Sequence, residues 1–276
     1  MPASNARAVE KARSLPCDVI ILDLEDAVLP EAKPMARAAA VTAVRSHPFG
    51  EREVVIRVNG LSTPWGEADL AAAADAAPDG VLVPKIDGPR DIEAANRRLA
   101  GAPAHTRLWA MVETSAAVLA IGAIASAAAQ SRLAALVMGI NDLAKETGAR
   151  QGGEQAPFWA AMSLTVMAGR ANRLVVLDGV YNDIEDLAGL ELACRQAADF
   201  GFDGKTLIHP SHLDVCNRVF SPSAEEVAWA RAVIAAFEHP ANTGKGALRV
   251  DGRLAERLHL EMARRAVALA CAAGRS

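Results

Sequence analysis

Seven short apolar segments, each followed by an alanine-rich stretch, constrain the fold more than any other feature of this sequence. Continuous apolar runs of this length are typical of strands buried on both faces, and intervening helices are the connections that parallel strands require. The repeated strand-then-helix order therefore predicts a parallel α/β fold. The predicted strands with their polar ends lie at residues 18–26, 53–59, 80–85, 107–113, 133–142, 174–183 and 204–210.

A single (β/α)8 TIM barrel is the arrangement that this repeat favours, since the strands recur at the spacing of a βα unit. A complete barrel needs eight strands, so the first one must be a truncated strand at Met1 and Pro2, ahead of a helix over residues 4–15. In such a barrel the carboxyl ends of all strands meet at one rim, and polar residues there would share a pocket. We expect the barrel to occupy residues 1–220.

Residues 221–276 do not continue the repeat and are expected to form a C-terminal helical lid. Ser223 and Glu226 have the spacing of a capping box, which predicts a helix over residues 223–238. Pro240 and the glycines at positions 244, 246 and 252 indicate a flexible connection over residues 239–251, and a final helix is predicted over residues 253–273. The residues alone leave two uses open for this tail, and they slightly favour packing on its own barrel over covering a neighbouring subunit's pocket.

Composition argues against several classes of function. The net charge of −4 and the scattered basic residues give no surface for nucleic acid. No apolar run approaches the roughly 20 residues that span a bilayer, and the first residues lack the apolar core of a signal peptide. The four cysteines are far apart without a CxxC pair, as in reduced proteins. We therefore expect a cytoplasmic protein without nucleic-acid or membrane partners.

Glu113 and Asp142 end two consecutive predicted strands, so their carboxylates could meet at the rim. A shared Mg²⁺ ion would relieve their repulsion, because this ion takes one or two carboxylates and fills its other positions with water and substrate. A helix cap or a pairing with a nearby Arg or Lys is the alternative. Asp23 and Glu25 follow the first full strand and could accept hydrogen bonds from metal-bound waters or serve as a general base. Asp26 is better explained as part of a helix cap.

Two cations accompany these carboxylates. Arg57 lies within an apolar strand, and a buried arginine among carboxylates could be held as a clamp for an oxyanion, with a structural ion pair as the alternative. Lys85 follows Pro84, and its carboxylate neighbours favour an electrostatic role over a Schiff base. His209 could be structural or catalytic. No GxSxG, GxGxxG or Walker motif is present, which weakens the hydrolase-triad, dinucleotide and P-loop alternatives.

Several motifs together resemble one known group of proteins. They are PASNARAVEKARSLPCDVIILDLEDAV, IRVNGLSTPWGEADL, DGVLVPKID, MVETSAAV, MGINDLAKETGA, GFDGKTLIHP and TGKGALRVDGRLAERLHLEMARR. In combination and order they resemble the citrate lyase β-subunit-like proteins of the HpcH/HpaI aldolase group, and among these most of all the malyl-CoA and citramalyl-CoA lyases. The resemblance covers nearly the whole chain.

The resemblance implies a Mg²⁺-dependent barrel, with Mn²⁺ as an alternative ion, that makes or breaks a carbon–carbon bond next to a coenzyme A thioester. By motif, it implies that Glu113 and Asp142 hold the metal and that Arg57 clamps the developing enolate. Asp23 and Glu25 match the outer shell of the family's site and are expected to be catalytic.

The resemblance also implies substrate contacts. Asn59 of the IRVN motif and Lys85 are expected to bind substrate. The diphosphate of coenzyme A is expected near the first helix with Arg7 and Lys11, since a helix N-terminus and basic side chains favour anions. Asp251 resembles an aspartate that a neighbouring subunit's tail supplies as an acid/base group, which raises the expectation of a lid that crosses between subunits.

The function expected from the sequence is thus a lyase that joins or separates an acyl-CoA enolate and a 2-oxo acid, working as a homo-oligomer, a trimer or hexamer. Two alternatives remain open. The same site could hydrolyse the thioester of a 3-hydroxyacyl-CoA such as malyl-CoA, or the chain could be the β subunit of a citrate lyase complex with a carrier-protein partner.

Overall fold

The computed structural model describes residues 1–46, 49–152 and 155–273, which form two compact units. The first unit comprises residues 1–216 and the second residues 217–276.

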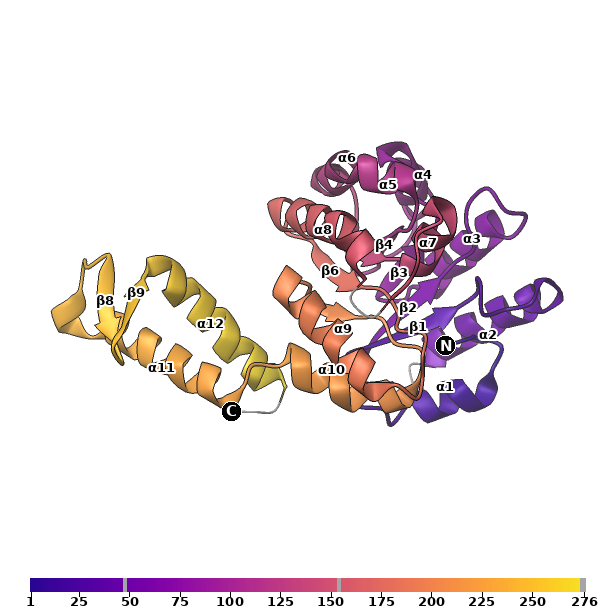
Figure 1. Cartoon of the computed structure of the whole chain (residues 1–276). Helices are drawn as coiled ribbons and strands as arrows, with labels where there is room; N and C mark the ends of the chain where they lie inside the picture. The colour runs from indigo at the N-terminus through magenta and orange to yellow at the C-terminus, as the bar shows by residue number, and fades with distance from the viewer. Residues whose placement is uncertain (47–48, 153–154, 274–276) are drawn as a thin grey trace. The chain divides into compact units, whose positions relative to one another are not determined.

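The first unit is built around seven parallel strands that pair in sequence order, as the apolar segments predict (Figure 1). Each strand is shorter than its apolar segment, because the polar residues at its end turn away into loops. The strands are β1 (Val19–Asp23), β2 (Glu53–Arg57), β3 (Gly80–Val83), β4 (Arg107–Val112), β5 (Leu133–Met138), β6 (Val175–Asp178) and β7 (Gly204–Lys205).

Helices connect these strands, and none in the described part of the chain is both long and apolar enough to cross a membrane. The α-helices are α1 (Ala6–Ala12), α2 (Lys33–Ser46), α3 (Gly66–Ala76), α4 (Pro89–Arg98), α5 (Ser115–Leu119), α6 (Ile121–Ser126), α7 (Ile140–Thr147), α8 (Trp159–Ala171), α9 (Leu187–Phe200) and α10 (Leu213–Phe220). Short 3-10 turns are η1 (Pro30–Ala32), η2 (Ala127–Gln130), η3 (Ala156–Phe158) and η4 (Pro210–His212).

The N-terminus supplies the truncated strand that the barrel interpretation requires. Pro2 forms a parallel bridge with Asp23, and the Asp23 N–H donates to the Met1 carbonyl at 2.8 Å. The Ala3 N–H donates in turn to the Asp23 carbonyl at 2.9 Å, and the terminal ammonium donates to the Ile21 carbonyl at 2.9 Å. Within the described residues no bridge joins this stub to β7, so the ring of strand pairing stays open at that one place.

The interior of the sheet is apolar at its centre and polar at the carboxyl ends of the strands. A buried cluster brings together inward-facing side chains of β2 to β5, namely Val55, Leu82, Trp109, Ala135 and Val137. Side chains two residues apart on a strand share a face. On β2, Arg57 therefore lies on the same face as Val55. On β1, Asp23 lies on the same face as Ile21, which packs against the same cluster.

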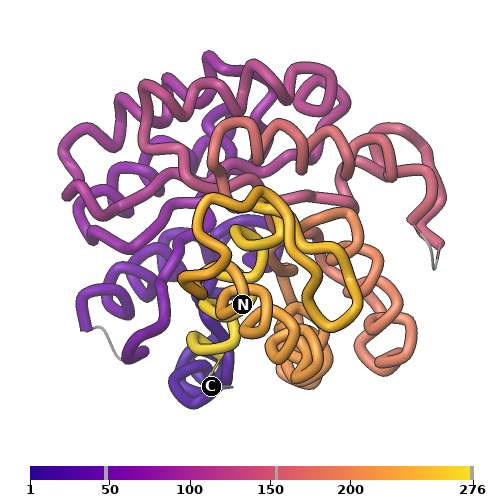
Figure 2. Tube along the Cα trace, turned by 90° about the vertical axis from the view of Figure 1, so that its left-hand side faces the viewer, coloured from indigo at the N-terminus to yellow at the C-terminus, as the bar shows by residue number. Residues whose placement is uncertain are grey.

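The second unit contains two long helices and a hairpin. Helix α11 (Ala224–Glu238) begins at the predicted capping box, in which the Ser223 N–H donates to Glu226 Oε2 at 2.7 Å. The prediction of a flexible connection over residues 239–251 is wrong. After the 3-10 turn η5 (Pro240–Asn242), strands β8 (Ala247–Val250) and β9 (Arg253–Glu256) form an antiparallel hairpin, drawn in yellow in Figure 2.

The hairpin turns at Asp251 and Gly252, both with positive φ (45° and 81°), the conformation that an Asp-Gly pair favours in a two-residue turn. The final helix, α12 (Arg257–Ala272), therefore begins four residues later than predicted. It packs along α11, and buried side chains from both helices and the hairpin form a small core of Ala230, Val233, Val250, Ala255 and Ala263.

Two other predicted boundaries shift slightly. The first helix occupies only Ala6–Ala12, where the Asn5 side chain accepts a hydrogen bond from the Ala8 N–H at 3.1 Å and caps the helix. The glycine-containing sequence of residues 151–159 also predicts a loop that leads into a helix from Ala160, and this helix begins at Trp159, directly after η3. Residues 153–154 of the loop predicted before it lie outside the described residues.

Candidate functional site

Asp23 and Arg57 are side by side at the carboxyl ends of β1 and β2, because the sheet register pairs these two positions. Arg57 Nε donates to Asp23 Oδ1 at 2.6 Å and Nη2 donates to Oδ2 at 2.7 Å, a two-pronged pairing that fixes the plane of the guanidinium. Burial alone would raise the pKa of Asp23, but the hydrogen bonds from Arg57 and from the N–H groups of Glu25 and Ala27 outweigh it and lower that pKa. Asp23 therefore stays ionised and acts as the anchor of Arg57.

The remaining guanidinium nitrogen of Arg57 faces other groups at the rim. Nη1 is 3.1 Å from Glu25 Oε2, 3.7 Å from Asp26 Oδ2 and 3.9 Å from the sulfur of Met111. Burial raises the pKa of Glu25 to about 8, and Arg57 only partly offsets this effect. Glu25 Oε2 is buried and has no hydrogen-bond partner among the described residues. Glu25 is thus a neutral acid near pH 7, placed against the outward nitrogen of a fixed arginine.

Replacing Glu25 by Gln is expected to make the metal-free protein less sensitive to alkaline pH. Because the pKa in the fold lies above the ordinary value of 4.5, the contribution of Glu25 to stability is fully present below that value and is lost as pH rises through about 8. A tenfold change in a proton-binding constant corresponds to about 1.4 kcal/mol, so the wild type should lose on the order of 3 kcal/mol relative to Glu25→Gln between pH 5 and 9.

Chemical denaturation in the presence of a chelator at several pH values measures this difference. Glu31→Gln, which changes an exposed carboxylate on η1, is the matched control and should follow the wild-type curve. Parallel curves for the wild type and Glu25→Gln would contradict the raised pKa.

Glu113 and Asp142 meet at the ammonium group of Lys85. Glu113 directly follows β4, Asp142 lies in the first turn of α7 after β5, and Lys85 follows β3. Lys85 Nζ is 2.7 Å from Asp142 Oδ2 and 3.3 Å from Glu113 Oε1. Three neighbouring strand ends therefore bring the two predicted metal ligands to one point.

The pair fits a hard divalent cation. Glu113 is 1% exposed, and its Oε2 atom is buried without a hydrogen-bond partner in the described part of the chain. Burial raises the pKa of Glu113 although Lys85 opposes this effect, so the carboxylate lacks the compensation that a metal would supply. Residues 1–46, 49–152 and 155–273 contain no cluster of three His, Cys, Asp or Glu side chains suited to a metal. Two carboxylates with water completing the shell is a common arrangement for Mg²⁺.

Glycine at position 139 makes this arrangement sterically possible. A Cβ atom at this position would lie 2.4 Å from Glu113 Cβ and 2.7 Å from Glu113 Oε2, distances that no real side chain tolerates. Only glycine lets the start of α7 approach Glu113 closely enough for Asp142 to reach the same point. Residues 139–142 (GIND) therefore contain both a position that requires glycine and the predicted metal ligand Asp142.

The two parts of the site lie near one another at the rim. Glu113 and Lys85 are both close enough to Glu25 to change its pKa, Glu113 upward and Lys85 downward. The site therefore contains a fixed guanidinium, a neutral buried acid and a pair of carboxylates. Such a set can bind an oxyanion, move a proton and hold a divalent cation within one rim.

Asn59, expected to bind substrate, has a different place in the structure. It is 2% exposed, and its Nδ2 donates to the Leu24 carbonyl at 2.8 Å and to Asp69 Oδ2 at 2.5 Å. Its Oδ1 accepts from Lys33 Nζ at 2.7 Å. Both polar atoms of the Asn59 side chain thus form hydrogen bonds within the protein, and they connect the loop after β2 to the loop after β1 and to the starts of α2 and α3.

Lys33 is a supporting residue that the sequence does not reveal. It is 5% exposed at the start of α2, and Nζ donates to the carbonyls of Leu24 and Glu25, both at 3.0 Å, in addition to Asn59. Nζ also lies 5.0 Å from the centre of the Trp65 ring, within the range of a cation–π contact. Lys33 thereby holds the main chain of the turn that carries Glu25.

Among the described residues, the structure shows no hydrogen bond or ion pair between the rim residues above and Arg7, Lys11, His209 or Asp178, which ends the sixth strand. Arg7 and Lys11 are exposed on α1, and the structure shows no ion pair for either among the described residues. Asp178 is buried in a 2.5 Å ion pair with Lys205, which gives it a structural role between β6 and β7. His209 accepts a hydrogen bond from the Ser211 N–H at 3.2 Å and caps η4.

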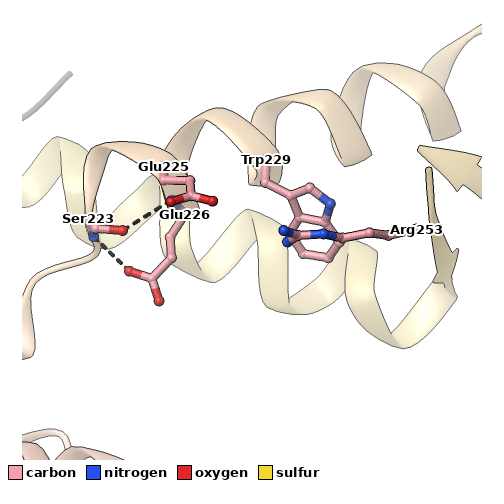
Figure 3. Close-up of a pocket in the computed structure, with 5 residues that line it drawn as sticks. All are labelled: Ser223, Glu225, Glu226, Trp229 and Arg253. Carbon is pink, nitrogen blue, oxygen red and sulfur yellow. Dashed lines mark hydrogen bonds between the residues drawn. The ribbon is translucent and has the colours of Figure 1, made fainter. Parts of the chain in front are cut away.

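Asp251 belongs to the second unit, at the exposed turn of the hairpin. That unit also has a hollow of about 390 Å³ between α11 and β9, shown in Figure 3 and lined by Ser223, Glu225, Glu226, Trp229 and Arg253. None of the residues predicted to be functional lines it.

Comparison with known proteins agrees with this geometry. Residues 1–210 match the family described as HpcH/HpaI aldolase/citrate lyase. The chain belongs to this family. The resemblance identified from the motifs is thereby confirmed, and Arg57, Glu113 and Asp142 lie inside the matched residues.

Relatives of this HpcH/HpaI protein act on coenzyme A thioesters. A (3S)-malyl-CoA thioesterase of Cereibacter sphaeroides is 45% identical over 98% of this chain and 92% of the relative. An L-malyl-CoA/β-methylmalyl-CoA lyase of the same species is 30% identical over 92% of this chain and 88% of the relative. The structure of the protein CitE of Mycobacterium tuberculosis with magnesium, acetoacetate and coenzyme A aligns with a TM-score of 0.77, 31% identity and coverage of 97% of this chain and 96% of CitE. The TIM-barrel class predicted from the sequence is therefore confirmed.

Proposed function

We propose that this HpcH/HpaI protein is a Mg²⁺-dependent enzyme that hydrolyses the thioester of (3S)-malyl-CoA or of a similar 3-hydroxyacyl-CoA. The observation that carries the proposal is the Asp23-anchored Arg57 beside the Glu113 and Asp142 pair. The choice of hydrolysis rests on the (3S)-malyl-CoA thioesterase, which is 45% identical over 98% of this chain. The motifs alone favour carbon–carbon cleavage, whereas the higher identity of the thioesterase supports hydrolysis.

Arg57 can stabilise the charge that hydrolysis creates. When water adds to the thioester carbonyl carbon, the carbonyl oxygen becomes negative, and a preorganised donor at that oxygen lowers the barrier. Two nitrogens of Arg57 are bound to Asp23, which leaves Nη1 oriented toward the pocket. The guanidinium therefore need not reorganise during the reaction.

Glu25 can move the proton that this reaction releases. The attacking water loses a proton, the carbon–sulfur bond breaks, and the coenzyme A thiolate must gain one, giving a free acid and a thiol. In the metal-free site the buried carboxyl group of Glu25 has a pKa of about 8, and a buried carboxyl beside Arg57 can accept and return a proton. Mg²⁺ or Mn²⁺ held by Glu113 and Asp142 would supply a Lewis acid for oxygens of the hydroxy acid part.

Carbon–carbon cleavage is the second candidate, because the L-malyl-CoA/β-methylmalyl-CoA lyase covers 92% of this chain at 30% identity. In that reaction a base takes the hydroxyl proton, and the bond breaks to a 2-oxo acid and a thioester enolate. Arg57 would then stabilise the enolate oxygen. The same residues serve both reactions, so the products distinguish them.

An assay of two products tests the proposal. The protein is incubated with Mg²⁺ and malyl-, methylmalyl- or citramalyl-CoA, and free thiol and 2-oxo acid are measured in parallel, with Glu113→Gln as the matched control. Thiol release without 2-oxo acid supports hydrolysis. Formation of 2-oxo acid without thiol assigns the lyase reaction, and an absence of both products overturns the proposal.

We further propose that the protein is a homo-oligomer, a trimer or a multiple of one, in which Asp251 from one subunit's tail completes a neighbour's pocket. The family resemblance of the RVDG segment supports this assignment, as does the tight turn that presents Asp251. Arg7 and Lys11 remain the proposed contacts for the coenzyme A diphosphate.

Mixing inactive variants should restore activity if Asp251 acts across subunits. In a mixture of Arg57→Ala and Asp251→Ala proteins, some pockets would combine an intact Arg57 with an intact Asp251. We expect about a quarter or less of wild-type turnover after subunit exchange, a fraction set by random assembly of closed oligomers. Each variant exchanged with itself is the control. Exchange proven by labelled subunits without recovered activity would refute the shared site.

A further inference from the structure

Lys85 interacts with the carboxylate pair through both its main chain and its side chain. Its N–H donates to Glu113 Oε1 at 2.7 Å, and this direction of the peptide requires a left-handed backbone with φ of +53°. A non-glycine residue in that region costs on the order of 1 kcal/mol or more, and such strain is concentrated at functional sites. The main-chain contact orients Glu113 independently of where the lysine side chain points.

The ammonium group of Lys85 occupies the space between the two carboxylates. Its distances of 2.7 Å to Asp142 Oδ2 and 3.3 Å to Glu113 Oε1 leave no room for a metal ion bound to both oxygens. The Lys85 side chain is 37% exposed, so the ammonium has a route to solvent. Gly60 leaves space beside the lysine stem, since a Cβ there would lie 3.6 Å from Lys85 Cγ.

The charges around this point favour replacement of the single positive charge by two. Six side chains at the rim are charged beside the neutral Glu25, namely the cations Arg57 and Lys85 and the carboxylates Asp23, Asp26, Glu113 and Asp142. The two cations leave an excess of negative charge. A divalent cation at the same point would compensate it more fully, and the displaced ammonium would regain its hydration.

We propose that the Lys85 ammonium is an internal counter-ion of the metal-free site, which a divalent cation displaces when it binds. This inference rests on the metal site of the proposed function. Lys85 lowers the apparent affinity for the metal, because only the fraction of molecules with the ammonium displaced is competent to bind. Its main-chain N–H keeps Glu113 oriented in both states. The side chain therefore favours an exchangeable metal and compensates the repulsion between the two carboxylates when no metal is bound.

The direction in which one substitution changes the affinity for a divalent cation tests the proposal. Lys85→Met keeps the main-chain N–H and most of the stem but removes the ammonium. The dissociation constant for Mn²⁺, followed by the electron paramagnetic resonance signal of the free ion, should fall about tenfold or more. Lys145→Met removes an exposed ammonium from α7, the helix that also carries Asp142, and should change the constant less than twofold. Equal or weaker Mn²⁺ binding by folded Lys85→Met overturns the proposal.

Glu113→Gln separates this inference from the metal site itself. If the wild type binds Mn²⁺ and Glu113→Gln does not, the site is the one described, and the Lys85→Met result then judges the counter-ion alone. If Glu113→Gln binds Mn²⁺ as the wild type does, the metal site of the proposed function fails, and the counter-ion proposal fails with it.

Chemical labelling of the unaltered protein gives a second measurement that does not depend on the folding of a variant. An amine-reactive acetylating reagent followed by mass spectrometry reports how accessible each lysine is. Saturating Mg²⁺ should increase acetylation of Lys85 several-fold and leave Lys145 unchanged. If acetylation of Lys85 stays constant or decreases with Mg²⁺, the proposal that the cation displaces the ammonium is overturned.

Discussion

Glu113→Gln is expected to abolish Mg²⁺-dependent turnover, with a loss of at least about a hundredfold in kcat, since a metal that polarises the substrate contributes several kcal/mol to the transition state. Gln keeps the size of the side chain, so it still fits against Gly139 and can still accept the Lys85 N–H. What it loses is the anionic Oε2 atom, which is buried without a hydrogen-bond partner among the described residues. Turnover and Mg²⁺ binding measured by calorimetry should fall together.

Stability distinguishes a lost ligand from a damaged fold. Burial raises the pKa of Glu113, so the ionised form is disfavoured in the metal-free protein. Replacing it with a neutral amide should leave the thermal midpoint unchanged or higher in chelator, while the midpoint gain from Mg²⁺ disappears. Asp142→Asn should behave similarly. A Glu113→Gln protein with normal activity, or wild-type activity that persists in chelator, would exclude this pair as the metal ligands.

The barrel can be predicted because its signals are local and repeated. Each apolar run and its helix carry the strand-and-helix pattern independently, so all seven strands are found at the predicted places, and their polar ends mark the rim. The stub at Pro2 also follows from the need for an eighth strand, and its bridge to Asp23 confirms it. Boundaries are less accurate because the polar residues that end each predicted segment lie beyond the strands, in the loops or helices that follow.

The hairpin of the second unit differs from the prediction although its signal is present in the sequence. Asp251 and Gly252 separate two short segments of alternating character, which is the usual sequence of a two-residue β-turn. The glycines close by favour the interpretation as a flexible connection. The local pattern around a single Asp-Gly pair is more informative than the glycine content of the segment.

Lys33 could not be found from the sequence. A lysine at the start of a helix is normally exposed, and the neighbouring residues do not indicate which groups accept its hydrogen bonds. Its partners are the Leu24 and Glu25 carbonyls and the Asn59 side chain, from two different strand-end loops. Only the packing of α2 beside β1 and β2 brings these groups together. The same packing explains why Asn59, which the motif suggests as a ligand contact, is buried.

Arg57→Lys is expected to lose most of the catalytic rate, on the order of a hundredfold or more in kcat, as is typical when one preorganised oxyanion donor is removed. Arg57 binds both oxygens of Asp23 and still directs Nη1 into the pocket, and an ammonium group cannot reproduce this planar fork. The lysine would pair with Asp23 and leave the oxyanion position without a donor. Steady-state kinetics should show the loss mainly in kcat, whichever products form.

Arg52→Lys, at an arginine that donates to the Leu15 and Phe49 carbonyls away from the pocket, is the matched control and should stay near wild-type activity. Near-normal kcat in folded Arg57→Lys would reassign Arg57 to a structural ion pair with Asp23.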